Sequence, residues 1–166
     1  MINITLLSKL SVANTINKDL GLMKKLLILF FLTAFLSACT SLTHQEHNTL
    51  RSLKAEGITV DKPAGSWERP ANPAGAGALN ILPGFGNFYL ASGNGGDSSQ
   101  YLYGFLNLIT WPVSVIWGIP EAAIDAYRIN EREMIYFYTY DQSGKAALQQ
   151  RGLEMSNIGT VIKRRP

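Results

Sequence analysis

The fold that the sequence predicts depends on an almost uncharged stretch, residues 71–120, which reads ANPAGAGALNILPGFGNFYLASGNGGDSSQYLYGFLNLITWPVSVIWGIP. Asp97 is its single charged residue and lies in a glycine-rich segment, residues 92–97. Two long uncharged runs on either side of such a segment are typical of two apolar helices joined by a turn. We therefore expect a helical hairpin with arms at residues 77–91 and 100–117.

Proline interrupts both arms of this hairpin. Pro83 shortens the first arm, and Pro112 removes a helical hydrogen bond from the second. A helix needs about 20 apolar residues to span a bilayer, so we expect the hairpin to lie in or on one membrane leaflet, or to pack on a partner. Aromatic rings suit such a contact, and the candidate residues are Phe85, Phe88, Tyr89, Tyr101, Trp111 and Trp117. Alternatively, these rings fill the core of a small soluble domain.

A short motif in the first arm supports the hairpin. Residues 83–89 (PGFGNFY) resemble the Pro-Gly-x-Gly-x-Phe-Tyr signature of TM2-like small membrane proteins. In that family a similar motif opens the first helix, and an aromatic residue with an aspartate closes the second. The resemblance assigns the closing positions to Trp117 and Asp125, and it implies a hairpin without naming any chemistry.

A second motif lies nearer the start of the chain, where residues 23–39 read MKKLLILFFLTAFLSAC. Two lysines precede an apolar run at residues 26–36, which has the length of a signal-peptide core and is too short to span a bilayer. The last four residues, Leu36, Ser37, Ala38 and Cys39, resemble the lipobox of bacterial lipoproteins. The resemblance implies a signal peptide at residues 23–38, cleavage before Cys39, and acylation of Cys39 with chains such as palmitate. The alternative is a free cysteine at the end of a hydrophobic helix.

The residues around this motif bear on charge and location. Residues 1–22 fit no part of the pattern, and we interpret them as an upstream extension before a start at Met23, or as a long n-region. Residues 1–38 hold 4 of the 15 basic and 1 of the 12 acidic residues, which leaves 11 of each. Charge therefore offers no argument for nucleic-acid binding. Thr40 stands where inner-membrane lipoproteins carry aspartate, so the resemblance implies the outer membrane, facing the periplasm.

The remaining segments are more polar. Residues 39–75 are broken by proline and glycine and suggest a flexible tether after the acylated cysteine, with a short helix near residues 49–54 and with Trp67 docked on the body. Residues 76–140 hold the hairpin and an amphipathic helix, for which Pro120 and Glu121 suit the start. Its charged face is either solvated or a latch beneath the hairpin, and residues 134–140 fit a strand or the helix end. Residues 141–166 form a polar, basic C-terminal segment with a short strand or helix.

No combination of residues indicates catalysis. His44 and His47 lie in the expected tether, where with Glu46 they would make a poor metal site. We expect a mainly α protein without catalytic residues, metal, cofactor or nucleic-acid partner. The predicted function is a lipid-anchored, non-enzymatic protein of the bacterial envelope that contacts membrane or an envelope partner through its apolar hairpin. The alternative is a small soluble periplasmic ligand-binding domain held by the lipid.

Overall fold

The computed structural model describes residue 25 and residues 41–93, 96–156 and 159–163. The chain falls into two units, residues 1–39 and 40–166, and every described residue except Lys25 belongs to the second. The expected signal peptide and Cys39 lie outside the described residues, apart from Lys25. The second unit is mainly helical, which confirms the predicted fold class.

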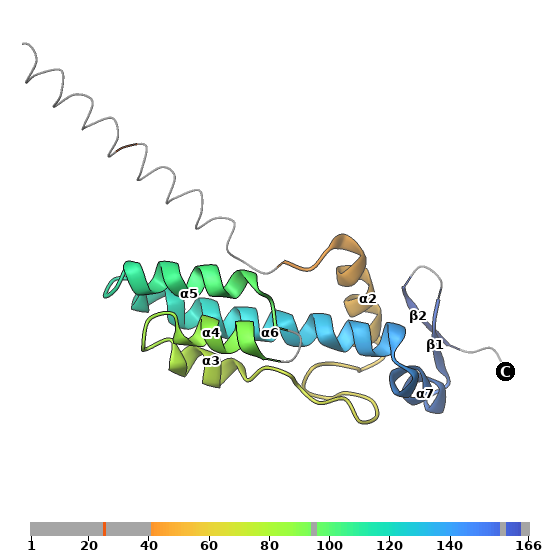
Figure 1. Cartoon of the computed structure of the whole chain (residues 1–166). Coiled ribbons are helices and arrows are strands. Elements are labelled where there is room, and N and C mark those ends of the chain that lie inside the picture. Colours follow the sequence, from red (N-terminus) through yellow and green to blue (C-terminus); the bar gives the residue numbers. More distant parts are fainter. Residues whose placement is uncertain (1–24, 26–40, 94–95, 157–158, 164–166) are drawn as a thin grey trace, which may run out of the picture. The chain divides into compact units, whose positions relative to one another are not determined.

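One long helix, α6, organises the second unit: the other described helices of this unit lie beside it (Figure 1), and the two strands contact α7 and α2. In chain order these elements are α2 (His44–Ala55), α3 (Pro73–Leu79), α4 (Phe85–Ser92), α5 (Ser99–Ile109), α6 (Val115–Tyr140), α7 (Gln142–Gln150), β1 (Leu153–Met155) and β2 (Val161–Lys163). The two strands pair antiparallel, with Leu153 opposite Lys163. The helices α3, α4 and α5 lie beside the first half of α6, whereas α2 and α7 lie beside its second half.

The two halves of α6 belong to two lobes with separate buried clusters, and the second cluster extends to Ala71 and Ile129 at the border between the lobes. We call residues 73–127 the apolar lobe, and residues 41–72 with 128–163 the polar lobe. The polar lobe has a conventional apolar core, which contains Leu42, Leu50, Leu53, Ile58, Val60, Ala64, Trp67, Met134, Ile135, Tyr138, Ala147, Leu148 and Leu153. The second cluster lies between the first half of α6 and its neighbours and consists mostly of alanine: Ala71, Ala76, Leu90, Ala122, Ala126 and Ile129.

The structure differs from the expectation of a flexible tether at residues 39–75. The helix α2 begins with a capping box in which Thr43 and Glu46 satisfy each other's backbone donors. Leu50 and Leu53 are buried on one face, as the sequence predicts, and Trp67 is docked in the core. The tether prediction was wrong because the prolines and glycines only turn the segment, while its apolar residues find partners on α6 that are distant in sequence.

Charged side chains of α6 hold α2 in place. The Lys54 Nζ lies 2.8 Å from Glu131 Oε1, and the Glu131 side chain is largely buried. The Arg132 guanidinium lies 3.5 Å from the Glu46 carboxylate and also donates to the carbonyl of Ser41 at 3.0 Å. This part of the charged face is therefore neither merely solvated nor a latch on the hairpin, because its ion pairs reach α2.

Two helix boundaries in the second arm also differ from expectation. The arm is not one helix over residues 100–117: α5 ends at Ile109 and α6 begins at Val115. Pro112 lies between them, where it lacks a backbone donor and disfavours a helical conformation for the preceding residue. Pro120 does not start a helix but lies inside α6. The helix continues to Tyr140, so the helical alternative for residues 134–140 is confirmed.

Hydrogen bonds of Tyr138 join α6 to the segment that contains Ala64, and their loss should lower the stability of the fold. Its buried hydroxyl donates to the Ala64 carbonyl at 2.8 Å and accepts from the Ala64 amide at 2.6 Å. Tyr138→Phe leaves both backbone groups buried without a partner, and we expect it to lower the free energy of unfolding by about 1–3 kcal/mol. Chemical denaturation of the full chain in mild detergent measures this. Tyr140→Phe, at a residue 71% exposed, is the control, and equal losses in both variants would contradict the prediction.

Candidate functional site

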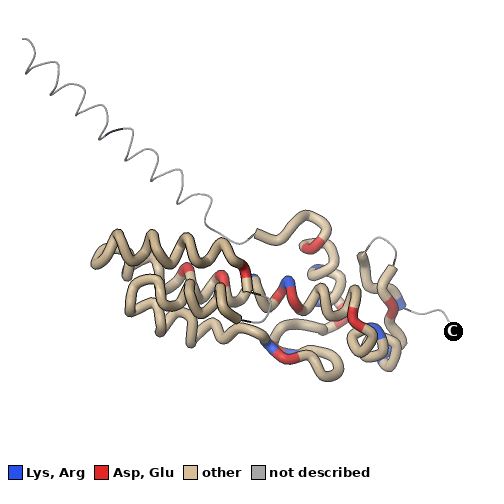
Figure 2. Tube along the Cα trace, in the orientation of Figure 1, with Lys and Arg blue, Asp and Glu red and all other residues tan. Residues whose placement is uncertain are grey.

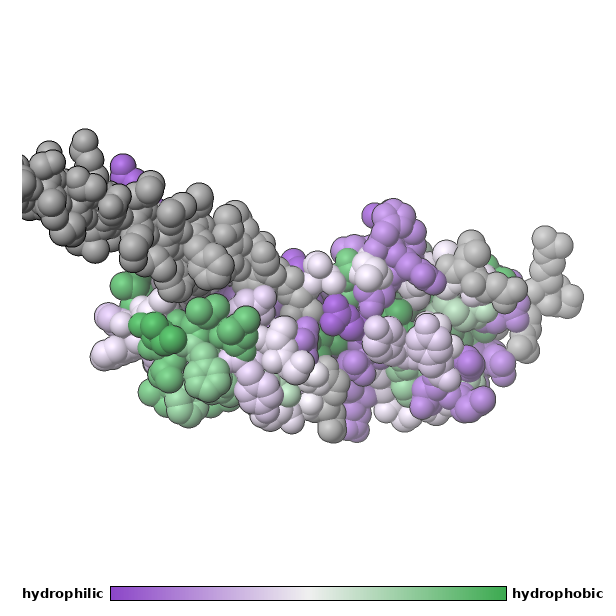
Figure 3. All heavy atoms as spheres, turned by 45° about the horizontal axis from the view of Figure 1, so that its top comes forward, coloured by the Kyte–Doolittle hydropathy of each residue, from purple (hydrophilic) through white to green (hydrophobic). Residues whose placement is uncertain are grey.

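Large apolar side chains cover the outside of the apolar lobe. Ile116 is 79% exposed and Ile109 is 74% exposed. We call the full set the apolar surface, and its members are Leu79, Ile81, Leu82, Phe85, Tyr101, Leu102, Phe105, Leu108, Ile109, Trp111, Val113, Ile116 and Ile124. Figure 3 shows apolar side chains gathered on this end of the second unit. Soluble monomers rarely expose a contiguous apolar patch beyond a few hundred Å², so this surface indicates a contact site.

Charge is almost absent from the same lobe. Residues 73–127 contain Asp97, Glu121 and Asp125 as charged side chains and no Lys or Arg. In Figure 2 the described Lys and Arg positions of the second unit all lie in the polar lobe. The apolar surface therefore meets its surroundings without positive charges that would attract an anionic group.

The interior of the apolar lobe is polar. Asn87, Gln100, Asn107 and Asp125 are each at most 2% exposed. The Asn107 amide donates to the Asn87 side-chain oxygen at 2.9 Å, and the Asn87 amide donates to the Gln100 side-chain oxygen at 2.8 Å. The Gln100 amide in turn donates to the Asp125 carboxylate at 2.8 Å. This chain of hydrogen bonds, which we call the interior network, links α4, α5 and α6.

Further hydrogen bonds attach the surrounding backbone to these helices. The Asn80 amide donates to the Gly118 carbonyl at 2.5 Å, and its oxygen accepts from the Gly86 amide at 3.0 Å. The Trp117 indole donates to the Asn107 side-chain oxygen at 3.1 Å. Buried polar groups are costly unless they are paired, and here Asn80 and Asn107 pair with backbone groups of Gly118 and Gly86 and with the Trp117 indole.

The spacing of residues in α5 explains why polar side chains are buried in this lobe while apolar side chains are exposed. Gln100, Gly104 and Asn107 follow one another at intervals of four and three, so they share the buried face of the helix. Leu102, Phe105 and Ile109 lie toward the opposite side and are exposed. In a bilayer, polar side chains pair inside a helical bundle and apolar side chains face the lipid. The polarity of α5 therefore suits lipid better than water.

Two glycines allow the helices of this lobe to approach closely. A Cβ on Gly104 would lie 2.4 Å from a ring carbon of Phe88, and a Cβ on Gly86 would lie 2.2 Å from the Ala76 carbonyl oxygen. Gly84 precedes α4 with φ +83°, a conformation that glycine adopts at little cost. The break at residues 83–84 that the sequence predicts is thus real, since α3 ends at Leu79 and α4 begins at Phe85.

The predicted contact residues divide into two groups. Phe85, Tyr101 and Trp111 are 49%, 44% and 61% exposed and belong to the apolar surface. The other three are half-buried: Phe88 packs against Phe105 and Gly104, Tyr89 accepts from the Asn72 amide, and Trp117 donates to Asn107.

Sequence reasoning missed most members of the apolar surface because it selected aromatic residues and passed over the aliphatic ones. It also assigned no role to Asn107. The helical spacing of Gln100 and Asn107 opposite Leu102 and Ile109 carried the signal that would have separated the two faces.

Two carboxyl groups lie in or beside the interior network. The pKa of Glu121 is raised to about 7, chiefly because burial penalises its charge and also because Asp125 lies nearby. A hydrogen bond with Asn107 acts in the opposite direction. Glu121 therefore gains or loses its proton near neutral pH.

Comparison with protein-family models, with curated proteins and with solved structures finds no match to this chain. Among the described residues, no helix combines the length and the hydropathy that crossing a bilayer requires. The same residues hold no group of three or more His, Cys, Asp or Glu that is placed to share a metal ion. The geometry of the apolar lobe therefore carries the functional conclusion.

Glu121 makes the stability of the fold depend on pH. Its pKa is about 7 in the folded chain against an ordinary 4.5, so the folded state binds the proton more tightly. Its contribution is fully present below about pH 4.5 and is lost as the pH rises through 7. We expect the free energy of unfolding to fall between pH 5 and pH 8, and Glu121→Gln to remove much of that fall. Chemical denaturation at several pH values measures this.

Glu68→Gln is the control for the pH experiment, because Glu68 is exposed in the polar lobe. A Glu121→Gln protein whose stability changes with pH as steeply as that of the wild type would contradict the prediction.

Proposed function

We propose that this chain is a lipid-anchored, non-enzymatic protein of the bacterial cell envelope, and that its apolar surface enters one leaflet of a membrane. The observation that carries the proposal is the inverted polarity of the apolar lobe. Asn87, Gln100 and Asn107 pair in its interior, while residues such as Ile109 and Ile116 face outward. In a protein surrounded only by water, apolar side chains are usually buried and amide side chains are usually exposed, which is the reverse of this arrangement.

Energetics favour lipid as the surroundings of the apolar surface. Removing one large apolar side chain from water is worth about 1.5–3 kcal/mol when burial is complete. Stable membrane anchoring takes at least two signals. The acylated Cys39 implied by the lipobox and the apolar surface together supply two such signals.

The dimensions of the helices also suit one leaflet. The helix α5 has 11 residues, which at 1.5 Å per residue corresponds to about 16 Å. The hydrocarbon core of a bilayer is about 30 Å thick, so one leaflet contributes about 15 Å. A helix of this length matches the depth of a single leaflet.

The alternative of a soluble ligand-binding domain finds less support in the packing. It requires the aromatic residues of the hairpin to form the core of the lobe. The buried cluster there consists mostly of alanine, and Trp111 is 61% exposed. For the location we retain the outer membrane, facing the periplasm, which the lipobox and Thr40 imply.

Substitution of Cys39, the one cysteine of the chain, tests the lipid anchor. The full chain and its Cys39→Ser variant are expressed in a bacterium with two membranes, labelled with a fatty-acid analogue, and fractionated. We expect label on the wild type alone, in the outer-membrane fraction, because the thiol is the acceptor of the lipid. Equal label on both proteins, or none on either, would contradict the lipobox interpretation.

The apolar surface is tested separately, in the Cys39→Ser background without a lipid. The variant Ile109→Ser/Trp111→Ser/Ile116→Ser removes three strongly exposed apolar side chains, which are 74%, 61% and 79% exposed. We expect the parent protein to float with phosphatidylcholine vesicles and the triple variant to bind at least tenfold more weakly, because it loses several kcal/mol of apolar transfer.

Ile162→Ser, at a residue 42% exposed on β2, is the matched control and should bind like the parent. A triple variant that stays folded by circular dichroism and still binds fully would show that the apolar surface does not enter the membrane. Binding to no vesicle by any of these proteins would favour an envelope protein as the partner.

A further inference from the structure

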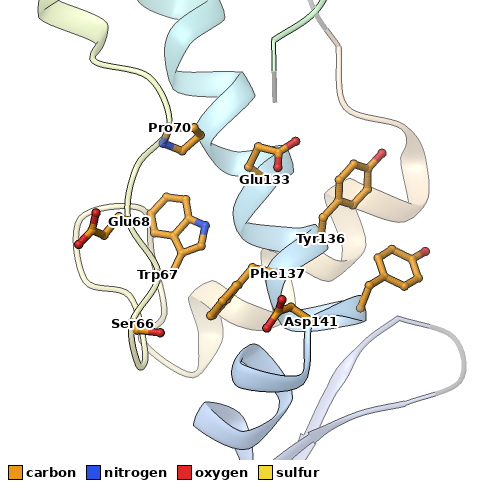
Figure 4. A pocket seen from close by; sticks show the side chains of 9 residues that line it. Ser66, Trp67, Glu68, Pro70, Glu133, Tyr136, Phe137 and Asp141 are labelled. Atoms are coloured by element: carbon orange, nitrogen blue, oxygen red, sulfur yellow. The ribbon is translucent and has the colours of Figure 1, made fainter. Parts of the chain in front are cut away.

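A groove in the polar lobe lies on the second half of α6, away from the apolar surface. It has a volume of about 580 Å³ and is lined by Ser66, Trp67, Glu68, Pro70, Glu133, Tyr136, Phe137, Tyr140 and Asp141. Figure 4 shows that residues 66–70 form one wall and that α6 forms the other, with Asp141 at the end of the helix. Apart from the docking of Trp67, the sequence predicts no role for this surface.

Aromatic rings make up much of the lining. Trp67 is 8% exposed, so its position is fixed by the core, while Tyr136 and Tyr140 are 42% and 71% exposed. The rings of these two tyrosines lie 5.9 Å apart along the exposed side of α6. Rigid aromatic side chains with one polar end are enriched where proteins bind partners.

The charges of the lining are all negative. Glu133 and Asp141 lie on either side of Phe137 in Figure 4, and Glu68 lies on the opposite wall. The pKa of Asp141 is lowered, chiefly because Ser143 donates hydrogen bonds to it at the start of α7, so it stays ionised at neutral pH.

Two arginines near the groove are paired with carboxylates outside its lining. Arg69 lies 3.3 Å from Asp61, and Arg132 lies 3.5 Å from Glu46, neither of which lines the groove.

We propose that this groove binds an arginine side chain presented by a segment of a partner protein. A guanidinium stacks on aromatic faces and pairs with carboxylates, and it is less strongly hydrated than an ammonium. Carboxylates beside aromatic walls meet both requirements, whereas an anionic ligand would face three carboxylates in a lining that contains no Lys or Arg. This inference does not rest on the proposed membrane function, because the groove shares no residue with the apolar surface.

The three tryptophans of the chain make the test internally controlled. Trp67 lines the groove, while Trp111 and Trp117 belong to the apolar lobe. The full chain, labelled with ¹⁵N in detergent micelles, is titrated with acetyl-Gly-Arg-Gly-amide, and the three indole N–H signals are followed by NMR. We expect a saturable shift of the Trp67 signal and none of the other two. The same peptide with Gln or Glu in place of Arg should leave all three unchanged.

Two variants of the groove test separately how charge and ring stacking contribute to binding. Glu133→Gln should weaken binding of the arginine peptide roughly fivefold, because a charge-assisted hydrogen bond becomes a neutral one. Tyr140→Leu should weaken it by a similar factor, because the ring that stacks on the guanidinium is lost. Glu56→Gln, which changes the same charge outside the lining, should bind like the wild type.

The proposal is overturned by a Trp67 signal that does not respond to the arginine peptide, or that responds equally to the Gln peptide. A response to the Glu peptide alone would indicate an anion site and overturn it as well. Loss of binding in Glu56→Gln to the same extent as in Glu133→Gln would show a general effect of charge rather than a site.

Discussion

The form of the apolar lobe depends on the chain of hydrogen bonds that runs from Asn107 through Asn87 and Gln100 to Asp125. Each of these side chains needs a partner once it leaves water, and the others provide it. With much of the interior occupied by amides, most of the large apolar side chains of these helices lie outside, and Leu90 is an exception. The apolar surface is thus a consequence of the polar interior.

The helix α6 joins this inverted lobe to an ordinary one. Its first half offers alanines at positions 122 and 126, which let neighbouring helices approach closely, whereas its second half offers Met134, Ile135 and Tyr138 to a conventional core. The polar lobe therefore draws its stability from the hydrophobic effect in water, while the apolar lobe draws much of its own from paired amides. Because both lobes pack on one continuous helix, that helix fixes the position of one lobe relative to the other.

Local features were predictable from the sequence, and distant contacts were not. The mainly α fold, the buried face of α2 and the break at residues 83–84 follow from helical spacing and from proline chemistry. The docking of Trp67 was predicted, but the packing of residues 58–64 was not, because this segment meets a part of α6 that is distant in sequence, as the hydrogen bond between Tyr138 and the Ala64 backbone illustrates. The split between α5 and α6 was missed because an uncharged run shows no boundary in its hydropathy.

The candidate site, too, was predictable from the sequence only in part. Composition alone marked residues 71–120 as a contact region, but it could not say which side chains face outward, because apolar and amide residues are mixed along each helix. The structure resolves this through Gln100 and Asn107, which share one face of α5.

The length of α6 separates the apolar surface from the groove. Its 26 residues correspond to about 39 Å, more than twice the depth of one leaflet. Ile116 lies near its start, and the tyrosine pair of the groove lies at its end. Lipid favours the first of these regions and excludes the second, whose carboxylates cannot leave water cheaply without partners. A chain with this polarity therefore presents its groove to the aqueous side whenever its apolar surface is in the membrane, so one helix carries both contacts without competition between them.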